Sequence, residues 1–196
     1  MQLLIISGFL GAGKTTLIIQ LAKEALAKKI KVAVIVNEIG EIGIDDQFMR
    51  QLDLNVWEIL GGCICCTLAG DLGNTLDKLI EQYQSDLVLL EPSGAADLRT
   101  INEIITAYED RTIFKTCKLT IVDPLRLPML MEVLTPLITS QIQSAEWVLI
   151  NKEDVATTED MENARRTVSH LHPEAKIICT SVKREFDPPL LDALLP

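Results

Sequence analysis

The sequence is poor in aromatic residues, in histidine and in positive charge. Phe, Trp and Tyr together make up 4% of its 196 residues, and histidine occurs twice. Eighteen Lys and Arg residues stand against 28 Asp and Glu residues, so the formal net charge is −10. Nucleic acids and anionic membranes attract positively charged surfaces, so we expect neither to be the main partner.

Long apolar runs and a targeting segment are missing as well. No stretch approaches the roughly 18 consecutive apolar residues of a membrane-spanning helix, although 48% of the residues are hydrophobic. The first apolar run already begins at Leu3, so we expect no signal or transit peptide. These features predict a cytoplasmic protein.

Cysteine is scarce, and its number is odd. Five cysteines without a secretory signal favour a reducing compartment over a disulfide framework. Cys117 and Cys179 lie in or beside apolar runs, so we expect them to be small core residues. The other three form a Cys-x-Cys-Cys cluster directly after two glycines: Cys63, Cys65 and Cys66.

The cysteine cluster favours binding of a thiophilic metal, because it brings three soft donors together. Zn²⁺ takes four ligands in a tetrahedron, and Glu41 or Glu38 is our candidate for the fourth. The spacing differs from the paired Cys-x₂-Cys of closed structural zinc sites, so we expect exchangeable metal. A buried cysteine cluster or a Cys63/Cys65 redox pair is the alternative.

A glycine-rich segment at residues 8–15 reads Gly-Phe-Leu-Gly-Ala-Gly-Lys-Thr and matches the phosphate-binding loop G-x-x-x-x-G-K-[ST]. An apolar run precedes it and a helical pattern follows, which is the context that this motif requires. The glycines let backbone N–H groups turn toward an anion, and the helix N-terminus adds partial positive charge. We expect Lys14 to neutralise the β- and γ-phosphates and Thr15 to bind Mg²⁺. The predicted phosphate-binding residues are Gly11, Ala12, Gly13, Lys14, Thr15 and Thr16.

Acidic residues at two strand ends are candidates for the magnesium site. One apolar run ends in Glu91, a position that suits a carboxylate holding Mg²⁺ directly or through water. Gly94 is then placed to donate its N–H to the γ-phosphate and so to sense hydrolysis. Asp123 ends another apolar run and is the rival of Glu91 for the metal.

The acidic segment 37–46 contains two glycines and resembles a mobile switch. We expect Glu38 or Asp45 to reach Mg²⁺ or to orient the attacking water, with a solvated acidic loop as the alternative.

Residues 151–154 read Asn-Lys-Glu-Asp directly after an apolar run and resemble the guanine-specificity signature N-K-x-D. The Asp154 carboxylate can accept hydrogen bonds from the ring N–H and the amine of guanine, a donor pair that adenine lacks. Lys152 is expected to lie over the ring. A later polar turn, Ser181 and Val182, is expected to contact the guanine oxygen. An ordinary charged turn is the alternative, but the place after a strand and downstream of a P-loop favours guanine.

Strand-like runs alternate with helical patterns along the whole chain. The runs lie near residues 3–7, 31–36, 54–59, 86–91, 117–122, 146–151 and 176–180, and the helical patterns near 15–29, 71–84, 98–108, 125–143 and 158–171. This alternation implies a mostly parallel sheet with helices on both faces. We therefore predict an α/β fold, the three-layer sandwich of P-loop NTPases, in one domain spanning 1–196. The apolar tail 190–195 is expected to pack back or to dock on a partner.

The motifs GFLGAGKTT, NEIGEIGID, GGCICC, EPSG and NKED occur in the order and spacing of the CobW-like metallochaperone GTPases. The chain resembles this family, a P-loop branch that includes the HypB and UreG nickel-insertion GTPases, over roughly residues 1–185. The resemblance implies a metal, usually zinc or cobalt, on the three cysteines, and a homodimer across the nucleotide face. Family members usually carry a second C-terminal domain, which we expect to be absent here. The resemblance also assigns Glu91 to Mg²⁺ and Gly94 to the γ-phosphate. It assigns Asn151, Lys152 and Asp154 to the recognition of guanine.

Together these features predict a Mg²⁺-dependent GTPase that binds Zn²⁺ or Co²⁺ and delivers it to a client metalloenzyme, or assists insertion of a metal cofactor. We expect slow hydrolysis without client or metal. One alternative is a GTP-gated chaperone of a corrinoid or metal-cofactor enzyme without transfer of a free ion. Another is a metal-buffering or metal-sensing module that responds to nucleotide.

Overall fold

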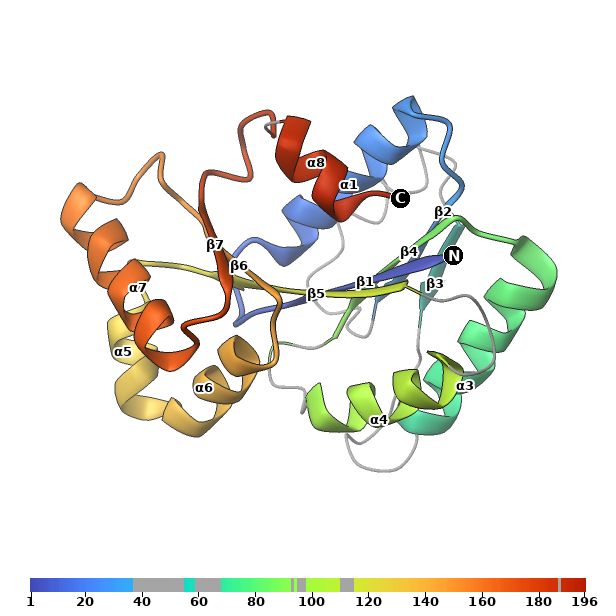
Figure 1. Ribbon diagram of the computed structural model, residues 1–196, viewed down its shortest axis with the longest axis horizontal. Coiled ribbons are helices and arrows are strands. Elements are labelled where there is room, and N and C mark those ends of the chain that lie inside the picture. Colours follow the sequence, from blue (N-terminus) through green and yellow to red (C-terminus); the bar gives the residue numbers. More distant parts are fainter. Residues whose placement is uncertain (37–54, 59–67, 93, 95–97, 110–114, 187) are drawn as a thin grey trace.

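The computed structural model of the protein describes residues 1–36, 55–58, 68–92, 94, 98–109, 115–186 and 188–196. Within these residues, seven strands form one sheet in the order β3-β2-β4-β1-β5-β6-β7, and every neighbouring pair is parallel (Figure 1). All seven fall on the runs predicted from the sequence. The strands are β1 (Gln2–Ser7), β2 (Val32–Val36), β3 (Asn55–Glu58), β4 (Leu87–Glu91), β5 (Lys115–Val122), β6 (Trp147–Ile150) and β7 (Lys176–Cys179).

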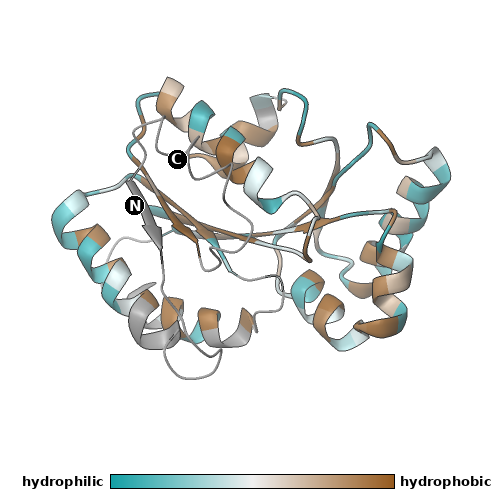
Figure 2. Cartoon of the chain, turned by 180° about the vertical axis from the view of Figure 1, so that it is seen from behind, coloured by the Kyte–Doolittle hydropathy of each residue, from teal (hydrophilic) through white to brown (hydrophobic). Residues whose placement is uncertain are grey.

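The central strands are apolar along their whole length because both of their faces are covered. Every residue of β1 and β2 is buried. In β1, Leu4 and Ile6 pack into the core on one face, and Leu3 and Ile5 pack into the core on the other. Figure 2 shows these hydrophobic residues concentrated along the strands. Parallel sheets need such continuous apolar runs, since helices lie against both sides.

The helices of the described residues complete two outer layers (Figure 1). On one face lie α1 (Lys14–Ala27) and α8 (Pro188–Leu194). On the other face lie α3 (Leu68–Lys78), α4 (Leu98–Glu109), α5 (Leu127–Val133), α6 (Thr135–Gln143) and α7 (Thr158–Leu171). Helix α3 continues into a π-helical turn, Leu79–Tyr83. The predicted three-layer sandwich is therefore confirmed. None of the helices described has both the length and the apolar character needed to cross a lipid bilayer.

One predicted helix is wrong in its extent. The pattern over 125–143 predicts a single helix, whereas the structure has the two helices α5 and α6. The break falls at Leu134, whose φ of −128° and ψ of 32° are not helical. Pro136 lies in the first turn of α6. A proline is tolerated in a first turn, but inside a continuous helix it removes a hydrogen bond and clashes with the preceding turn.

The apolar tail packs back on the domain as helix α8. Leu191 and Leu194 are buried in the same core as α1. The Gln2 side chain, at the start of β1, donates from Nε2 to the backbone oxygen of Leu194 at 2.8 Å. The last helix is therefore part of the main core.

Candidate functional site

The segment between β1 and α1 has the backbone that a P-loop needs. Gly8, Gly11 and Gly13 have positive φ angles of 144°, 73° and 111°, a region that residues with a Cβ rarely adopt. A Cβ on Gly13 would also lie 2.5 Å from Nδ2 of Asn151. Helix α1 begins at Lys14, so its N-terminus faces the loop. The loop is thus shaped for an anion by its glycines and by the start of a helix.

Lys14, Thr15 and Glu91 meet at the carboxyl end of β4. Lys14 Nζ lies 3.7 Å from a carboxylate oxygen of Glu91. The Thr15 hydroxyl lies 3.2 Å from each of the two Glu91 oxygens. Both Lys14 and Glu91 are largely shielded from solvent, with side-chain exposures of 8% and 13%. A hydroxyl and a carboxylate are hard oxygen donors of the kind that Mg²⁺ prefers, so the residues present fit this ion.

Asp123 is the rival carboxylate, and the structure gives it another partner. Its Oδ2 lies 2.6 Å from Nζ of Lys152, and its side chain is 3% exposed. Its Oδ1 accepts from the backbone N–H of Leu125, and its backbone oxygen accepts from Leu127. Asp123 therefore holds the turn before α5 and the lysine of N-K-x-D, while Glu91 is the carboxylate that contacts Lys14 and Thr15.

Lys152 itself has a left-handed backbone, with φ of 63°. This region is uncommon for a long side chain and persists where surrounding contacts hold it. The ion pair with Asp123 is such a contact.

Asn151 joins three segments of the site. Its side-chain Nδ2 donates to the backbone oxygen of Ala12 in the P-loop at 2.7 Å. Its Oδ1 accepts from the backbone N–H of Val182, after β7, at 2.8 Å. The residue is 2% exposed. The N-K-x-D segment, the P-loop and the polar turn after β7 are therefore fixed relative to one another by one buried amide.

Asp154 lies at the open side of this arrangement. Hydrogen bonding to the Ser181 side chain lowers the pKa of Asp154 below its usual value, and the nearby Lys183 ammonium, 3.5 Å away, acts in the same direction. Ser181 is buried, and its hydroxyl also accepts from the backbone N–H of Lys183. The carboxylate is thus kept ionised and able to accept hydrogen bonds near neutral pH.

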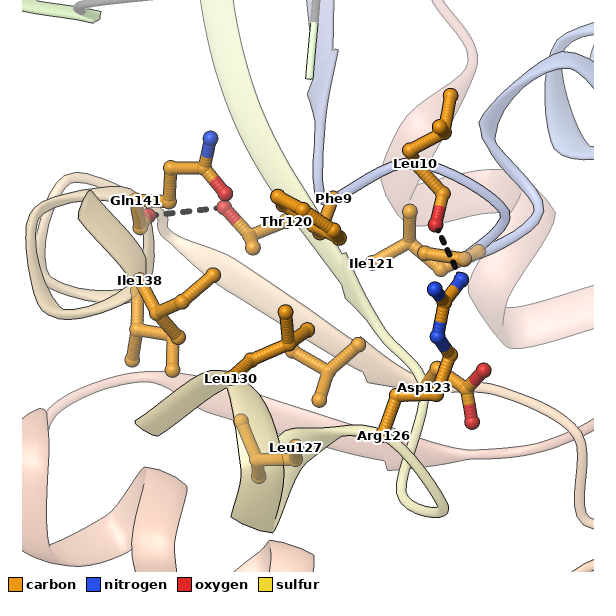
Figure 3. Close-up of a pocket in the computed structure, with 13 residues that line it drawn as sticks. Phe9, Leu10, Thr120, Ile121, Asp123, Arg126, Leu127, Leu130, Ile138 and Gln141 are labelled. Carbon is orange, nitrogen blue, oxygen red and sulfur yellow. Dashed lines mark hydrogen bonds between the residues drawn. The ribbon is translucent and has the colours of Figure 1, made fainter. Parts of the chain in front are cut away.

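Two residues of the site were not predicted from the sequence. Arg126 donates from a guanidinium nitrogen to the backbone oxygen of Leu10 in the P-loop at 2.9 Å (Figure 3). Gln141 in α6 donates from Nε2 to the backbone oxygen of Gly94 at 3.0 Å. For Gln141 a signal exists in the sequence, because it is a polar residue beside Ile138 and Ile142 on the apolar face of a helix. Arg126 has no comparable signal.

The predicted cargo-metal ligands and switch acids lie outside the described residues. They are Cys63, Cys65, Cys66, Glu38, Glu41 and Asp45. In the part of the chain that the structure describes, no three Cys, His, Asp or Glu side chains gather as a metal-binding group. Burial raises the pKa of Cys117 to about 11, and burial also raises the pKa of Cys179. Both are therefore poor thiolate donors. Cys117 is buried, as expected for a core residue, whereas Cys179 is only half-buried beside the core.

Comparison with known proteins shows the family. The model of the CobW/HypB/UreG nucleotide-binding domain matches residues 2–179. The chain belongs to the CobW/HypB/UreG family. This finding confirms the resemblance inferred from the five motifs.

Relatives in the CobW/HypB/UreG family agree in sequence and in structure. The zinc chaperone YeiR of Escherichia coli (strain K12) is 34% identical over 164 residues, which are 83% of this chain and 49% of that protein. The Zn(II)-bound YjiA GTPase of E. coli superposes with a TM-score of 0.67 at 25% identity, covering 97% of this chain and 60% of that one. The hydrogenase maturation factor HypB of Archaeoglobus fulgidus superposes with a TM-score of 0.69 at 18% identity, covering 99% and 88%, and shows the fold. The chain spans about half the length of the curated relatives it matches.

Proposed function

We propose that this chain binds GTP with Mg²⁺, hydrolyses it, and uses that cycle to control binding and delivery of Zn²⁺. The observation that carries the proposal is the meeting of Lys14 and Thr15 with Glu91 beneath a P-loop that Asn151 ties to the base-reading signature. A site built in this way from the ends of β1, β4 and β6 accommodates phosphates at one end and a base at the other. Membership of a family that includes zinc chaperones supports zinc as the cargo.

The side chains of the site have the following roles in the proposed hydrolysis of GTP. Lys14 and the N–H groups of the P-loop bind the phosphates and stabilise charge that develops during hydrolysis. Thr15 and Glu91 would hold Mg²⁺, which supplies charge neutralisation and orients the phosphates. Asp154 accepts from the two donors on the Watson–Crick edge of guanine, and Lys152, anchored by Asp123, lies over the ring.

Residues of two other segments complete the proposed mechanism. Gly94 donates its N–H to the γ-phosphate in this proposal, which its closeness to the P-loop supports, because a Cβ on it would lie 3.1 Å from the backbone nitrogen of Leu10. In the acidic segment 37–46, Glu38 orients the attacking water and Asp45 assists at Mg²⁺. We expect hydrolysis to be slow without client or cargo metal.

The cargo metal is a substrate of the proposed cycle. Cys63, Cys65 and Cys66 supply three thiolates, and Glu41 completes a tetrahedral Zn²⁺ site. The same donor set accepts Co²⁺ with lower affinity by the usual order of divalent metals. Thiolates must stay reduced, which suits the cytoplasm. The recipient is a client metalloenzyme.

A homodimer across the nucleotide edge is part of the proposal. Leu10, Leu125 and Val155 are large hydrophobic residues with exposures of 44%, 47% and 60%. They follow the carboxyl ends of β1, β5 and β6, and the proposed nucleotide site lies at the same end of the sheet. Exposed apolar residues grouped at a functional edge favour association there.

The test is the affinity of the reduced protein for Zn²⁺ and for Co²⁺ in three states: with Mg²⁺ and a non-hydrolysable GTP analogue, with Mg²⁺ and GDP, and without nucleotide. The doubly substituted Cys65→Ser/Cys66→Ser protein removes two ligands, and Cys179→Ser is the matched control. Tighter binding with the GTP analogue than with GDP, lost only in the double variant, is expected. Equal affinity in all three states contradicts gating, because a ligand couples to a metal only through differential affinity.

The rate of GTP hydrolysis distinguishes metal delivery from the two alternative functions, a metal buffer and a cofactor chaperone. A delivery GTPase hydrolyses GTP faster when Zn²⁺ is bound, whereas a metal buffer binds both ligands without metal-dependent hydrolysis. If a corrinoid enzyme and not free Zn²⁺ accelerates hydrolysis, the cofactor-chaperone alternative is the correct one.

A further inference from the structure

Gln141 is a buried polar residue on the inner face of α6. It is 2% exposed, and its neighbours on that face are Ile138 and Ile142. Its side-chain Nε2 lies 3.0 Å from the backbone oxygen of Gly94. A carbonyl oxygen only accepts, so the atom facing it must be the amide nitrogen. Burying an amide costs free energy unless it is hydrogen-bonded, and the contact with Gly94 supplies such a bond.

The backbone of Gln141 is itself anchored to the central strands. Its carbonyl oxygen accepts from the Thr120 hydroxyl in β5 at 2.9 Å (Figure 3). The Thr120 hydroxyl in turn lies 2.7 Å from the hydroxyl of Ser7, at the end of β1. All three residues are buried. The Gln141 side chain therefore extends toward Gly94 from a backbone that is fixed to β5 and β1.

Gly94 and the P-loop are held from the same helical pair. Arg126, before α5, binds the Leu10 oxygen, and Gln141, in α6, binds the Gly94 oxygen. A cavity of about 20 Å³, room for about one water molecule, lies between the P-loop and these helices (Figure 3). Gly94 packs directly on the P-loop, since a Cβ on it would lie 3.1 Å from the backbone nitrogen of Leu10. The hydrogen bond from Gln141 holds the Gly94 peptide at that contact.

We propose that Gln141 is a positioning residue that holds the Gly94 peptide against the P-loop and thereby sets the preference for GTP over GDP. This inference rests on the proposed contact of Gly94 with the γ-phosphate. Glycine has more backbone freedom than any other residue, so an untethered Gly94 loses more entropy when it binds phosphate. A tether made before binding removes part of that cost, and only GTP carries the phosphate concerned.

The test uses two changes at Gln141. Gln141→Met keeps the length and volume but has no donor. Gln141→Asn keeps the amide but is shorter by one methylene, so it serves if the methionine protein does not fold. Gln143→Met is the matched control, because Gln143 is an exposed glutamine of the same helix that contacts the Leu171 oxygen at 3.4 Å.

Affinities for GDP and for a non-hydrolysable GTP analogue are measured with Mg²⁺, together with the thermal midpoint of unfolding. Loss of one hydrogen bond is expected to weaken binding of the GTP analogue by about 3- to 10-fold and to leave GDP affinity within about twofold. The Gln143 protein should match the wild type. Equal weakening of both nucleotides by the Gln141 changes would show a merely structural role and overturn the inference.

Gly94→Ala separates this inference from the function on which it rests. If Gly94→Ala weakens the GTP analogue selectively while both Gln141 variants bind like the wild type, the inference is wrong and the proposed function stands. If Gly94→Ala leaves the ratio of the two affinities unchanged, the proposed γ-phosphate contact is wrong, and the role of Gln141 is wrong with it.

Discussion

The side-chain amide of Asn151 donates to the backbone oxygen of Ala12 at 2.7 Å, across 139 residues of sequence. The Oδ1 atom of the same side chain accepts from the backbone N–H of Val182. One residue thus uses both halves of its amide on backbone groups of buried residues. The P-loop, the N-K-x-D segment and the turn after β7 are therefore joined by one buried side chain.

Asn151→Ala should therefore destabilise the fold as well as the site. It leaves the Ala12 oxygen and the Val182 N–H buried without this partner, so we expect a loss of about 2–4 kcal/mol in the free energy of unfolding. Urea denaturation with and without GDP measures it. Asn163→Ala, an exposed asparagine of α7 that accepts from Arg166, should change stability by less than about 0.5 kcal/mol. Similar small losses in both variants would contradict the bridging role.

Glu91→Gln should raise the Mg²⁺ requirement. The change keeps the shape but removes the negative charge that faces Lys14 and Thr15. We expect the Mg²⁺ concentration for half-maximal binding of a GTP analogue to rise by about tenfold or more, as for the loss of a charge-assisted contact. Titration of Mg²⁺ by fluorescence-detected nucleotide binding checks this, with the exposed Glu162→Gln as control. An unchanged requirement would assign the metal to another carboxylate.

Asp154→Asn should switch the base that is read. Xanthine carries an oxygen where guanine carries its amine, so an asparagine amide can donate to it while the carboxylate cannot. We expect GDP affinity to fall by at least about tenfold and XDP affinity to rise. Competition between GDP and XDP measures both. Glu153→Gln changes the neighbouring exposed acid, which pairs with Arg184, and should leave the preference for GDP intact.

Thiol labelling should separate the five cysteines by their pKa values. At pH 8 a thiol with the raised pKa of about 11 of Cys117 is ionised in only about one molecule in a thousand, whereas an ordinary thiol near pKa 8.5 is ionised in about one in four. Raising the pH toward 11 should increase labelling of Cys117. Mass spectrometry after iodoacetamide treatment should find Cys63, Cys65 and Cys66 modified first, and Zn²⁺ should protect them. Equal early labelling of Cys117 would show that its site opens readily.

Leu194→Ala should cost a large part of the stability. The side chain is 0% exposed and packs in the core shared with α1. Truncation of such a leucine costs about 2–5 kcal/mol, which a chemical denaturation midpoint will show. Val133→Ala, at a residue that is 70% exposed, is the control and should cost less than about 0.5 kcal/mol. A small effect at Leu194 would mean that α8 is only loosely attached.

The sequence predicts the strands well, because a fully covered parallel sheet leaves continuous apolar runs such as Leu3–Ile6 in the chain. It predicts the extent of one helix wrongly. The apolar pattern over 125–143 continues through Pro136, and the break depends on backbone geometry at Leu134 that periodicity does not record.

Within the site, the sequence predicts which residues gather at the ends of the strands but not which of them touch. Glu91 and Asp123 both end apolar strands, and only the three-dimensional arrangement gives Glu91 to Lys14 and Asp123 to Lys152. Hydrogen bonds from the Arg126 and Gln141 side chains to distant backbone oxygens are still harder to predict from the sequence, because every residue has a backbone oxygen that can accept.

The central place of β1 in the sheet has a consequence for biosynthesis. This strand and the P-loop are made before the rest of the sheet, yet β4 and β5, which flank β1, and Asn151, which binds the Ala12 oxygen of the loop, are made much later. Chains fold from the N-terminus as they emerge, and pairing between distant segments is slow. A nascent chain that ends before β6 carries the nucleotide motif without the pocket. In the proposed function, nucleotide binding therefore becomes possible only after β6 and the polar turn that follows β7 have been made.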